Sequence, residues 1–467
     1  MLDGLTVERD GVDGKSIYVY GEGWNFGEVQ DNARGVNATQ LNMAGTGIGT
    51  FSDRLRDAAR GGGPFSGFQE QGFISGLLDA PNAAETRSPD EQKQQLLLYA
   101  DQIRVGLAGN LRDYQLVNGA GQTVSGDKVN YNGQPTGYTL DPQEHIVYVS
   151  AHDNETLFDA IQAKAPADLP LAERVRMHNL GLSLVALAQG VPFFHAGDDL
   201  LRSKSLDRNS YNSSDWFNRI DWTGQESAWG GGLPPAGDNQ EKWEIIKPLL
   251  ADPALKPAPA DIAAASASFR EMLRIRKSSP LFRLQTAEQV AEKVSFGNTG
   301  PDQIPGLIML ILSDAGADLD PQYDRIVVVF NATAQPQTVG DASLQNLEFA
   351  LHPIQAQSAD PLVKTAAYAP DSGFTVPGRT TAVFVQSESG GLGAPADATA
   401  TAAPAAPPLI STEAPELTAT PAATATPVAS PVPAESSPGA GWTVWVGTAV
   451  AVLAALGAGL YARSRRR

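Results

Sequence analysis

The sequence predicts an α/β domain followed by an antiparallel β domain, a stalk and one membrane-spanning helix. Over residues 1–260, short apolar runs alternate with segments of helical periodicity, a pattern typical of parallel α/β structure. From about residue 280 to 386, the apolar runs are β-branched and separated by Gly, Asp and Pro turns, which favours antiparallel strands. Near the end of the chain, a long run without charge predicts a helix that spans a bilayer.

Three apolar runs in residues 1–260 are predicted to form buried strands. They are IYVYG (17–21), HIVYVSA (145–151) and VPFFHAG (191–197). Residues 91–111 and 171–189 lie between such runs and have the spacing of apolar residues expected of helices.

The β domain is predicted over residues 261–388 as an antiparallel β-sandwich that packs behind the α/β domain. Its clearest strands are GLIMLIL, DRIVVVFN and TTAVFVQ, which are β-branched or alternate between apolar and polar residues.

The last 79 residues predict a stalk and an anchor. Residues 389–440 are rich in Ala, Thr and Pro, a composition that predicts a disordered stalk. The run WTVWVGTAVAVLAALGAGLYA within residues 441–463 has no charge, and as a helix it would be about 31 Å long, which matches a bilayer core. Arginines follow it at once, so residues 464–467 are predicted to be cytoplasmic. We therefore expect a single-pass protein with a lipid bilayer as partner and its globular part on the extracellular face.

Composition excludes several kinds of site. The net charge of −18 argues against a nucleic-acid partner, because phosphates need faces rich in Lys and Arg. The absence of cysteine excludes disulfides and thiolate metal sites, and the five histidines lack zinc-ligand spacing. We predict no metal and no cofactor.

Two predicted strands run directly into polar residues. IYVYG is followed by Glu22, Gly23 and Trp24, and HIVYVSA is followed by His152 and Asp153. In parallel α/β barrels, working residues follow the carboxyl ends of strands. Two carboxyl groups beside aromatic residues, here Trp24, Phe26 and Phe158, suit glycoside hydrolysis, in which one acid protonates the leaving oxygen and another supports the transition state. A pocket of this kind raises the pKa of one carboxyl group and keeps the other low.

Simpler interpretations of the same residues remain open on spacing alone. Glu22 is also compatible with an ordinary loop residue after a strand. Asp153 and Asn154 are equally compatible with an N-cap for a helix over residues 155–163.

Longer motifs resemble one enzyme family. YVYGEGWNFGEV resembles the third conserved region of the α-amylase superfamily in its pullulanase form, and YVSAHDNETLFD resembles the fourth. The resemblance implies that Glu22 is the general acid/base, that Asp153 stabilises the transition state and that His152 binds sugar hydroxyls. It also implies that Trp24 and Asn154 are among the substrate-binding residues.

Other stretches extend the resemblance over residues 1 to about 386. They are FSDRLRDAARGGGPF, QIRVGLAGN and, in residues 189–222, a segment similar to the one that shapes the pullulanase substrate cleft. In that segment Asp215 and Trp216 are expected to bind substrate, although core packing of Trp216 stays an alternative. FREMLRIRKSSPLFRL and LHPIQAQSADPLV resemble the pullulanase C-terminal β domain. The resemblance implies that residues 1–260 are the C-terminal half of a (β/α)8 barrel, strands five to eight.

The sequence also departs from the family pattern. The region that supplies Arg and the nucleophilic Asp, and an earlier Asn-His region, are not among these residues. The first residues, MLDGLTVERDGVDG, have no signal-peptide pattern, although the anchor requires export. We therefore expect an N-terminally truncated chain that is inactive or nearly so by itself. Calcium occurs in some relatives, but no acidic loop here is specific enough to assign it.

The resemblance implies an enzyme that debranches starch or pullulan by cleaving α-1,6-glucosidic bonds with retention of configuration. Two alternatives remain at this point: another hydrolase of the α-amylase superfamily, and a catalytically dead surface protein that only binds α-glucan.

Overall fold

Four parallel strands form the first sheet, in the order β1-β2-β7-β8, and confirm the predicted α/β class. They are β1 (Tyr20–Gly21), β2 (Gly49–Phe51), β7 (His145–Val147) and β8 (Val191–Pro192). The structure is a computed structural model that describes residues 2–316 and 319–387. Strands that are neighbours along the chain are also neighbours in this sheet, so the carboxyl ends of all four lie along one edge.

Helices separate the strands and follow the last of them. Before β8 they are α1 (Val7–Asp10), α2 (Gln40–Met43), α3 (Asp53–Arg60), α4 (Pro89–Leu107), α5 (Leu157–Lys164) and α6 (Leu171–Ala186). After β8 come α7 (Ser214–Asn218), α8 (Ala236–Asn239), α9 (Trp243–Ala251), α10 (Pro259–Ser278), α11 (Ala287–Lys293) and α12 (Pro353–Ala356). The two predicted helices are confirmed as α4 and α6. α4 begins where Ser88 and Glu91 form a reciprocal capping box.

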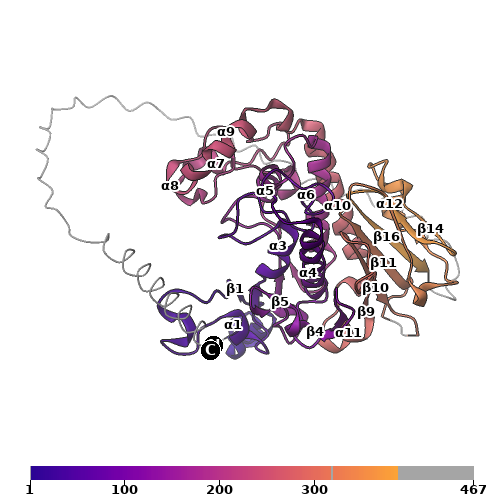
Figure 1. Cartoon of the computed structure of the whole chain (residues 1–467). Helices are drawn as coiled ribbons and strands as arrows, with labels where there is room; N and C mark the ends of the chain where they lie inside the picture. The colour runs from indigo at the N-terminus through magenta and orange to yellow at the C-terminus, as the bar shows by residue number, and fades with distance from the viewer. Residues whose placement is uncertain (1, 317–318, 388–467) are drawn as a thin grey trace, which may run out of the picture. The chain divides into compact units, whose positions relative to one another are not determined.

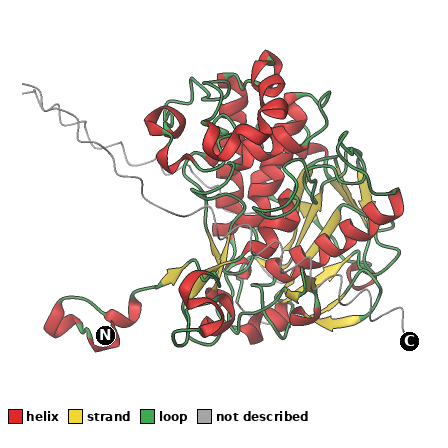
Figure 2. Cartoon of the chain, turned by 60° about the vertical axis from the view of Figure 1, so that its left-hand side comes forward, coloured by secondary structure: helices red, strands yellow, loops and turns green. Residues whose placement is uncertain are grey.

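The prediction that IYVYG is a buried strand was wrong. Only Tyr20 and Gly21 pair with β2, and Ile17 to Tyr20 are 39–51% exposed. The reason is that β1 lies at the edge of the sheet and has a neighbouring strand on one side only. Figure 2 shows the first turns of the chain projecting from the rest and joined to it through β1. The other two predicted strands are also shorter than expected. HIVYVSA contains only the buried strand β7 (His145–Val147), and VPFFHAG contains only β8 (Val191–Pro192), which is half-buried.

The second part is built from antiparallel strands, as predicted. A five-stranded sheet has the order β13-β16-β11-β10-β9, and a three-stranded sheet has the order β12-β15-β14. The strands are β9 (Val294–Gly297), β10 (Leu307–Ser313), β11 (Tyr323–Asn331), β12 (Gln337–Val339), β13 (Ala350–Leu351), β14 (Ala367–Ala369), β15 (Gly373–Val376) and β16 (Thr380–Ser387). Buried residues of both sheets, among them Val329, Phe374 and Phe384, form one apolar cluster. Two hairpins, β3 (Gln115–Val117) with β4 (Thr123–Ser125) and β5 (Asn130–Tyr131) with β6 (Gln134–Pro135), lie in the α/β part.

The α/β part and the β domain share a hydrophobic core. Val147 of β7, Leu182 of α6 and Val328 of β11 are all buried in one cluster. α4 and α6 contact strands of the large antiparallel sheet, and Figure 1 shows this sheet beside α4, α6 and α10. α10 runs across the predicted boundary at residue 260 and joins the two parts.

The predicted stalk and anchor lie outside the described residues. No helix within residues 2–316 and 319–387 is both long enough and apolar enough to cross a bilayer.

Candidate active site

Glu22 lies in the turn that leaves the carboxyl end of β1. Its side chain is exposed and forms no hydrogen bond or ion pair with the described residues. Gly23 follows with φ of 71°, and a Cβ at this position would lie 2.9 Å from the Thr50 side chain of β2. Glycine therefore allows the tight turn between Glu22 and Trp24 to pack against the neighbouring strand.

His152 and Asp153 lie in the loop between β7 and α5, and both side chains are exposed. Asn154 adopts a left-handed conformation (φ 57°) and donates from its amide to Asp153 Oδ2 over 3.0 Å. The alternative that Asp153 or Asn154 caps the next helix is wrong. Thr156 caps α5, since its hydroxyl accepts a hydrogen bond from the Asp159 amide. The exposed groups of His152 and Asp153 are thus free of a capping role.

β2 separates the strands that precede these two groups. Adjacent strands lie about 4.8 Å apart, so the ends of β1 and β7 are roughly 10 Å from one another. This separation allows Glu22 and the His152–Asp153 pair to contact the same oligosaccharide. The prediction that both groups follow parallel strands at one edge of a sheet is confirmed.

Trp24 is half-buried and lines a hollow of about 580 Å³ together with Asn25, Gln40, Asp53 and Tyr131. Its position beside this polar hollow suits contact with a sugar ring. The other two aromatic residues singled out in the sequence differ. Phe26 is exposed, whereas Phe158 is fully buried in α5 and packs against Trp229 with ring centroids 5.8 Å apart. Phe158 is therefore a core residue, because it falls on the inner face of a helix.

Asp215 and Trp216 lie on α7, in the segment after β8, and both are exposed. The Trp216 side chain is 54% exposed, so the alternative that it packs in the core is wrong. Its indole donates to the Gly231 carbonyl over 2.8 Å, and the Arg219 guanidinium lies 4.9 Å from its ring. Arg219 also lines a hollow of about 350 Å³, together with Arg202 and Asp221.

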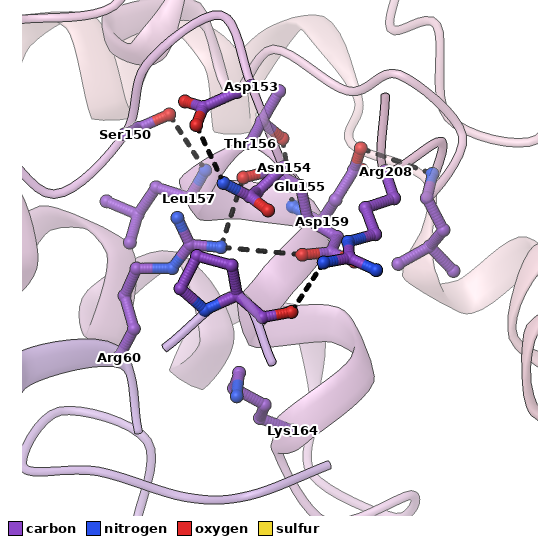
Figure 3. A network of polar contacts seen from close by, with 12 residues as sticks. Arg60, Ser150, Asp153, Asn154, Glu155, Thr156, Leu157, Asp159, Lys164 and Arg208 are labelled. Atoms are coloured by element: carbon purple, nitrogen blue, oxygen red, sulfur yellow. Dashed lines mark hydrogen bonds and ion pairs between the residues drawn. The ribbon is translucent and has the colours of Figure 1, made fainter. Parts of the chain in front are cut away.

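A network of charged side chains lies beneath the His152–Asp153 loop (Figure 3). Glu155 Oε2 lies 3.8 Å from Arg60 Nη2, and Glu155 Oε1 lies 3.7 Å from Lys242 Nζ. Burial opposes ionisation of Glu155, but the two cations outweigh it and lower the pKa of this carboxyl group. Sequence reasoning missed Arg60, Glu155 and Lys242. Arg60 falls in the FSDRLRDAARGGGPF motif, whose family resemblance marked the segment but did not indicate that Arg60 contacts Glu155.

His195 follows β8 and faces the same edge. Its Nδ1 lies 3.2 Å from the Ser150 hydroxyl and its Nε2 lies 2.8 Å from Arg202. Burial, assisted by the charge of Arg202, lowers the pKa of His195 to about 3, so its ring is neutral at pH 7. Asp198 is fully buried near Ser150, and burial raises the pKa of its carboxyl group to about 7.

Comparison with known proteins shows what the chain is similar to. Residues 224–387 match the family described as α-1,6-glucosidases, pullulanase-type, C-terminal. The chain is 50% identical over 397 residues to pullulanase 1, chloroplastic, of Arabidopsis thaliana, a match that covers 83% of this chain and 41% of the relative. This chain belongs to the pullulanase family. The resemblance found in its motifs is thereby confirmed.

Bacterial pullulanases show the same relationship. The pullulanase of Klebsiella pneumoniae is 40% identical over 389 residues, which are 81% of this chain and 35% of the relative. The crystal structure of the maltotriose complex of PulA from that organism superimposes with a TM-score of 0.75 at 40% identity, over 81% of this chain and 40% of PulA. The chain thus spans about two fifths of the length of these pullulanases.

Proposed function

We propose that this chain supplies the acid/base and the transition-state stabiliser of a hydrolase that cleaves α-1,6-glucosidic bonds in pullulan and starch-type glucans with retention. The observation that supports this most is the position of GEGW and HDN after the ends of β1 and β7, in a chain that is 50% identical to a plant pullulanase over 397 residues. Glu22 protonates the leaving oxygen, Asp153 stabilises the oxocarbenium-like transition state, and His152 binds sugar hydroxyls. Trp24, Asn154, Asp215 and Trp216 contact further parts of the glucan.

We further propose that the four parallel strands are one half of a (β/α)8 barrel. Their order along the sheet follows their order along the chain, as in such a barrel. The exposed apolar residues Ile17, Val19 and Tyr20 at the β1 edge suit pairing with another strand. None of the four strands ends in Arg-x-Asp, so the nucleophile of retaining hydrolysis is not expected among these residues.

Binding of maltotriose to the expressed chain tests the proposal. We expect calorimetry to detect binding, and we expect His152→Ala to weaken it about tenfold, because a hydrogen bond to a neutral sugar contributes roughly that much. Glu244→Gln, a change at an exposed residue of α9, serves as control and should leave the affinity unchanged. A chain that does not bind maltotriose would contradict the proposed function.

Release of reducing sugar from pullulan tests the catalytic roles. Because the nucleophile is not expected here, we predict equal and very low release by the unsubstituted chain and by Glu22→Gln. If the unsubstituted chain hydrolyses pullulan and Glu22→Gln lowers the rate 10²-fold or more, Glu22 is the acid/base and the nucleophile lies within these residues after all.

We also propose that residues 441–463 anchor the protein in a membrane, with residues 1–388 on the extracellular face. The length of the uncharged run and the arginines after it support this proposal. The full chain should sediment with membranes and be released by detergent, whereas a chain ending at residue 388 should stay in the supernatant. Sedimentation of both chains alike would contradict the anchor.

A further inference from the structure

The loop of residues 149–155 exposes only the side chains of His152 and Asp153 and has a firmly bound backbone. The Asp153 carboxylate accepts one hydrogen bond, from the neighbouring Asn154 amide. Four backbone carbonyls of the same loop, in contrast, accept hydrogen bonds from two cationic side chains that lie far away in the sequence. These cations are Arg60 and Lys204.

Arg60, the last residue of α3, binds the two ends of the loop. Its Nη1 donates to the Val149 carbonyl and its Nη2 to the Glu155 carbonyl, each over 3.1 Å. Figure 3 shows the guanidinium reaching toward Glu155 from below the loop. The Glu155 carboxylate lies near the same guanidinium, so Arg60 contacts both the backbone and the side chain of this residue.

Lys204, which lies in the segment after β8, binds the middle of the loop. Its ammonium donates to the His152 carbonyl over 3.1 Å and to the Asn154 carbonyl over 2.7 Å. These two carbonyls flank Asp153. The Lys204 side chain is 1% exposed, so water does not compete for its hydrogen bonds.

Lys204 is itself held in place by a buried carboxylate of α5. Asp159 accepts hydrogen bonds from the backbone amides of Lys204 (2.7 Å) and Leu206 (3.2 Å) and from the Ser203 hydroxyl (2.6 Å). Ser205 and Leu206 both have positive φ, at 52° and 63°. Consecutive residues of this kind in left-handed conformations are strained and persist only where the surroundings fix them, a situation that is concentrated at functional sites.

We infer that Lys204 and Arg60 are positioning residues, which fix the backbone beneath His152 and Asp153 so that both side chains meet the substrate. This inference rests on the proposed function for the roles of His152 and Asp153. Within the described residues, no other buried side chain donates to the four loop carbonyls that Arg60 and Lys204 bind. Loss of these hydrogen bonds would let the loop shift, and a displacement of about 1 Å at catalytic or binding groups lowers the rate or the affinity substantially.

Lys204→Met tests the inference, because methionine keeps the length of the side chain and removes the ammonium. We expect amide hydrogen exchange of residues 150–157 to become about tenfold faster or more, since two buried charge-assisted hydrogen bonds are lost. Exchange in β10 and β11 should not change. Maltotriose affinity should fall about tenfold, and Lys204→Arg, which restores a cation, should recover part of both effects.

Arg174→Met is the matched control. Arg174 is also fully buried and also donates to backbone carbonyls, those of Gln162, Pro166 and Leu169, at the other end of α5. We expect faster exchange around residues 162–170, with unchanged exchange at 150–157 and unchanged maltotriose affinity.

Three outcomes separate the inference from the proposed function. Unchanged exchange at 150–157 in Lys204→Met overturns the inference, and so does faster exchange without loss of maltotriose affinity. If the unsubstituted chain does not bind maltotriose, the proposed function fails, and the exchange of Lys204→Met and Arg174→Met still decides whether Lys204 fixes the loop.

Discussion

Replacement of Arg104 by alanine is expected to lower the free energy of unfolding by about 3–5 kcal/mol, because it leaves a buried charge without its partner. Arg104 of α4 is fully buried and donates to Asp101 Oδ1 over 2.8 Å. It also donates to the Asn298 carbonyl and to Gln303 Oε1, both over 2.7 Å, and so joins the α/β part to the β domain.

The main cost comes from Asp101. Burial already raises the pKa of this carboxyl group, although Arg104 and the Gly119 amide oppose the shift. Without Arg104, the carboxylate keeps only the Gly119 amide as a donor, and the Asn298 carbonyl and Gln303 Oε1 each lose a donor, in a place that water does not reach.

Urea denaturation of Arg104→Ala and Arg112→Ala measures the effect. Arg112 also pairs with an aspartate, Asp113, but both side chains are exposed. Exposed pairs contribute about 0–1 kcal/mol, so Arg112→Ala should change stability little. Equal effects of the two substitutions would contradict the assignment of Arg104 as a buried link between the two parts.

Lowering the pH from 6 to 4.5 is expected to destabilise the chain steeply. Burial lowers the pKa of His145 and His195 to about 3 and that of His178 and His352 to about 4. These rings stay neutral in the folded state, whereas the unfolded chain takes up protons near pH 6.5. Unfolding therefore binds protons in this range, and stability falls as the pH falls.

Two buried carboxyl groups act in the opposite direction. Burial raises the pKa of Asp159 to about 6 and that of Asp198 to about 7, so near pH 5 the folded state holds two protons that the unfolded state releases. Four protons bound by histidines on unfolding, less these two, leave a net uptake of about two. At ~1.4 kcal/mol per proton and pH unit, the free energy of unfolding should fall by ~3 kcal/mol per pH unit near pH 5.

Urea titrations between pH 4.5 and 6 measure this slope. His145→Leu removes one buried ring from β7 and should reduce the slope by ~1.4 kcal/mol per pH unit. A stability that does not vary with pH in this range, or an unchanged slope in His145→Leu, would contradict the prediction.

The order of strands and helices was predictable because it depends on local pattern. The predicted helix over 171–189 corresponds to α6 (Leu171–Ala186), and DRIVVVFN corresponds to β11 (Tyr323–Asn331). The three residues of β2 were missed because so short a strand has no periodicity. The exposure of Ile17 was missed because the sequence of a strand does not say whether it has one neighbour or two.

The candidate active-site residues were predictable to a similar extent. Glu22 directly follows β1, and His152 and Asp153 follow the apolar run that begins with β7, so their positions at one edge of a sheet follow from the sequence and the rules of parallel α/β folds. Their proposed roles come from the family resemblance. Burial of Phe158 in the core was not predictable, because it depends on which face of α5 packs against Trp229.

The sequence by itself therefore determined the succession of elements, the family and the residues at the strand ends. Only the tertiary structure decided what holds those residues in place. Arg60 and Lys204 lie about 90 and 50 positions from the loop that they bind, and no local pattern marks such a contact. Periodicity reports which face of an element is buried, whereas hydrogen bonds between distant segments depend on how the whole chain packs.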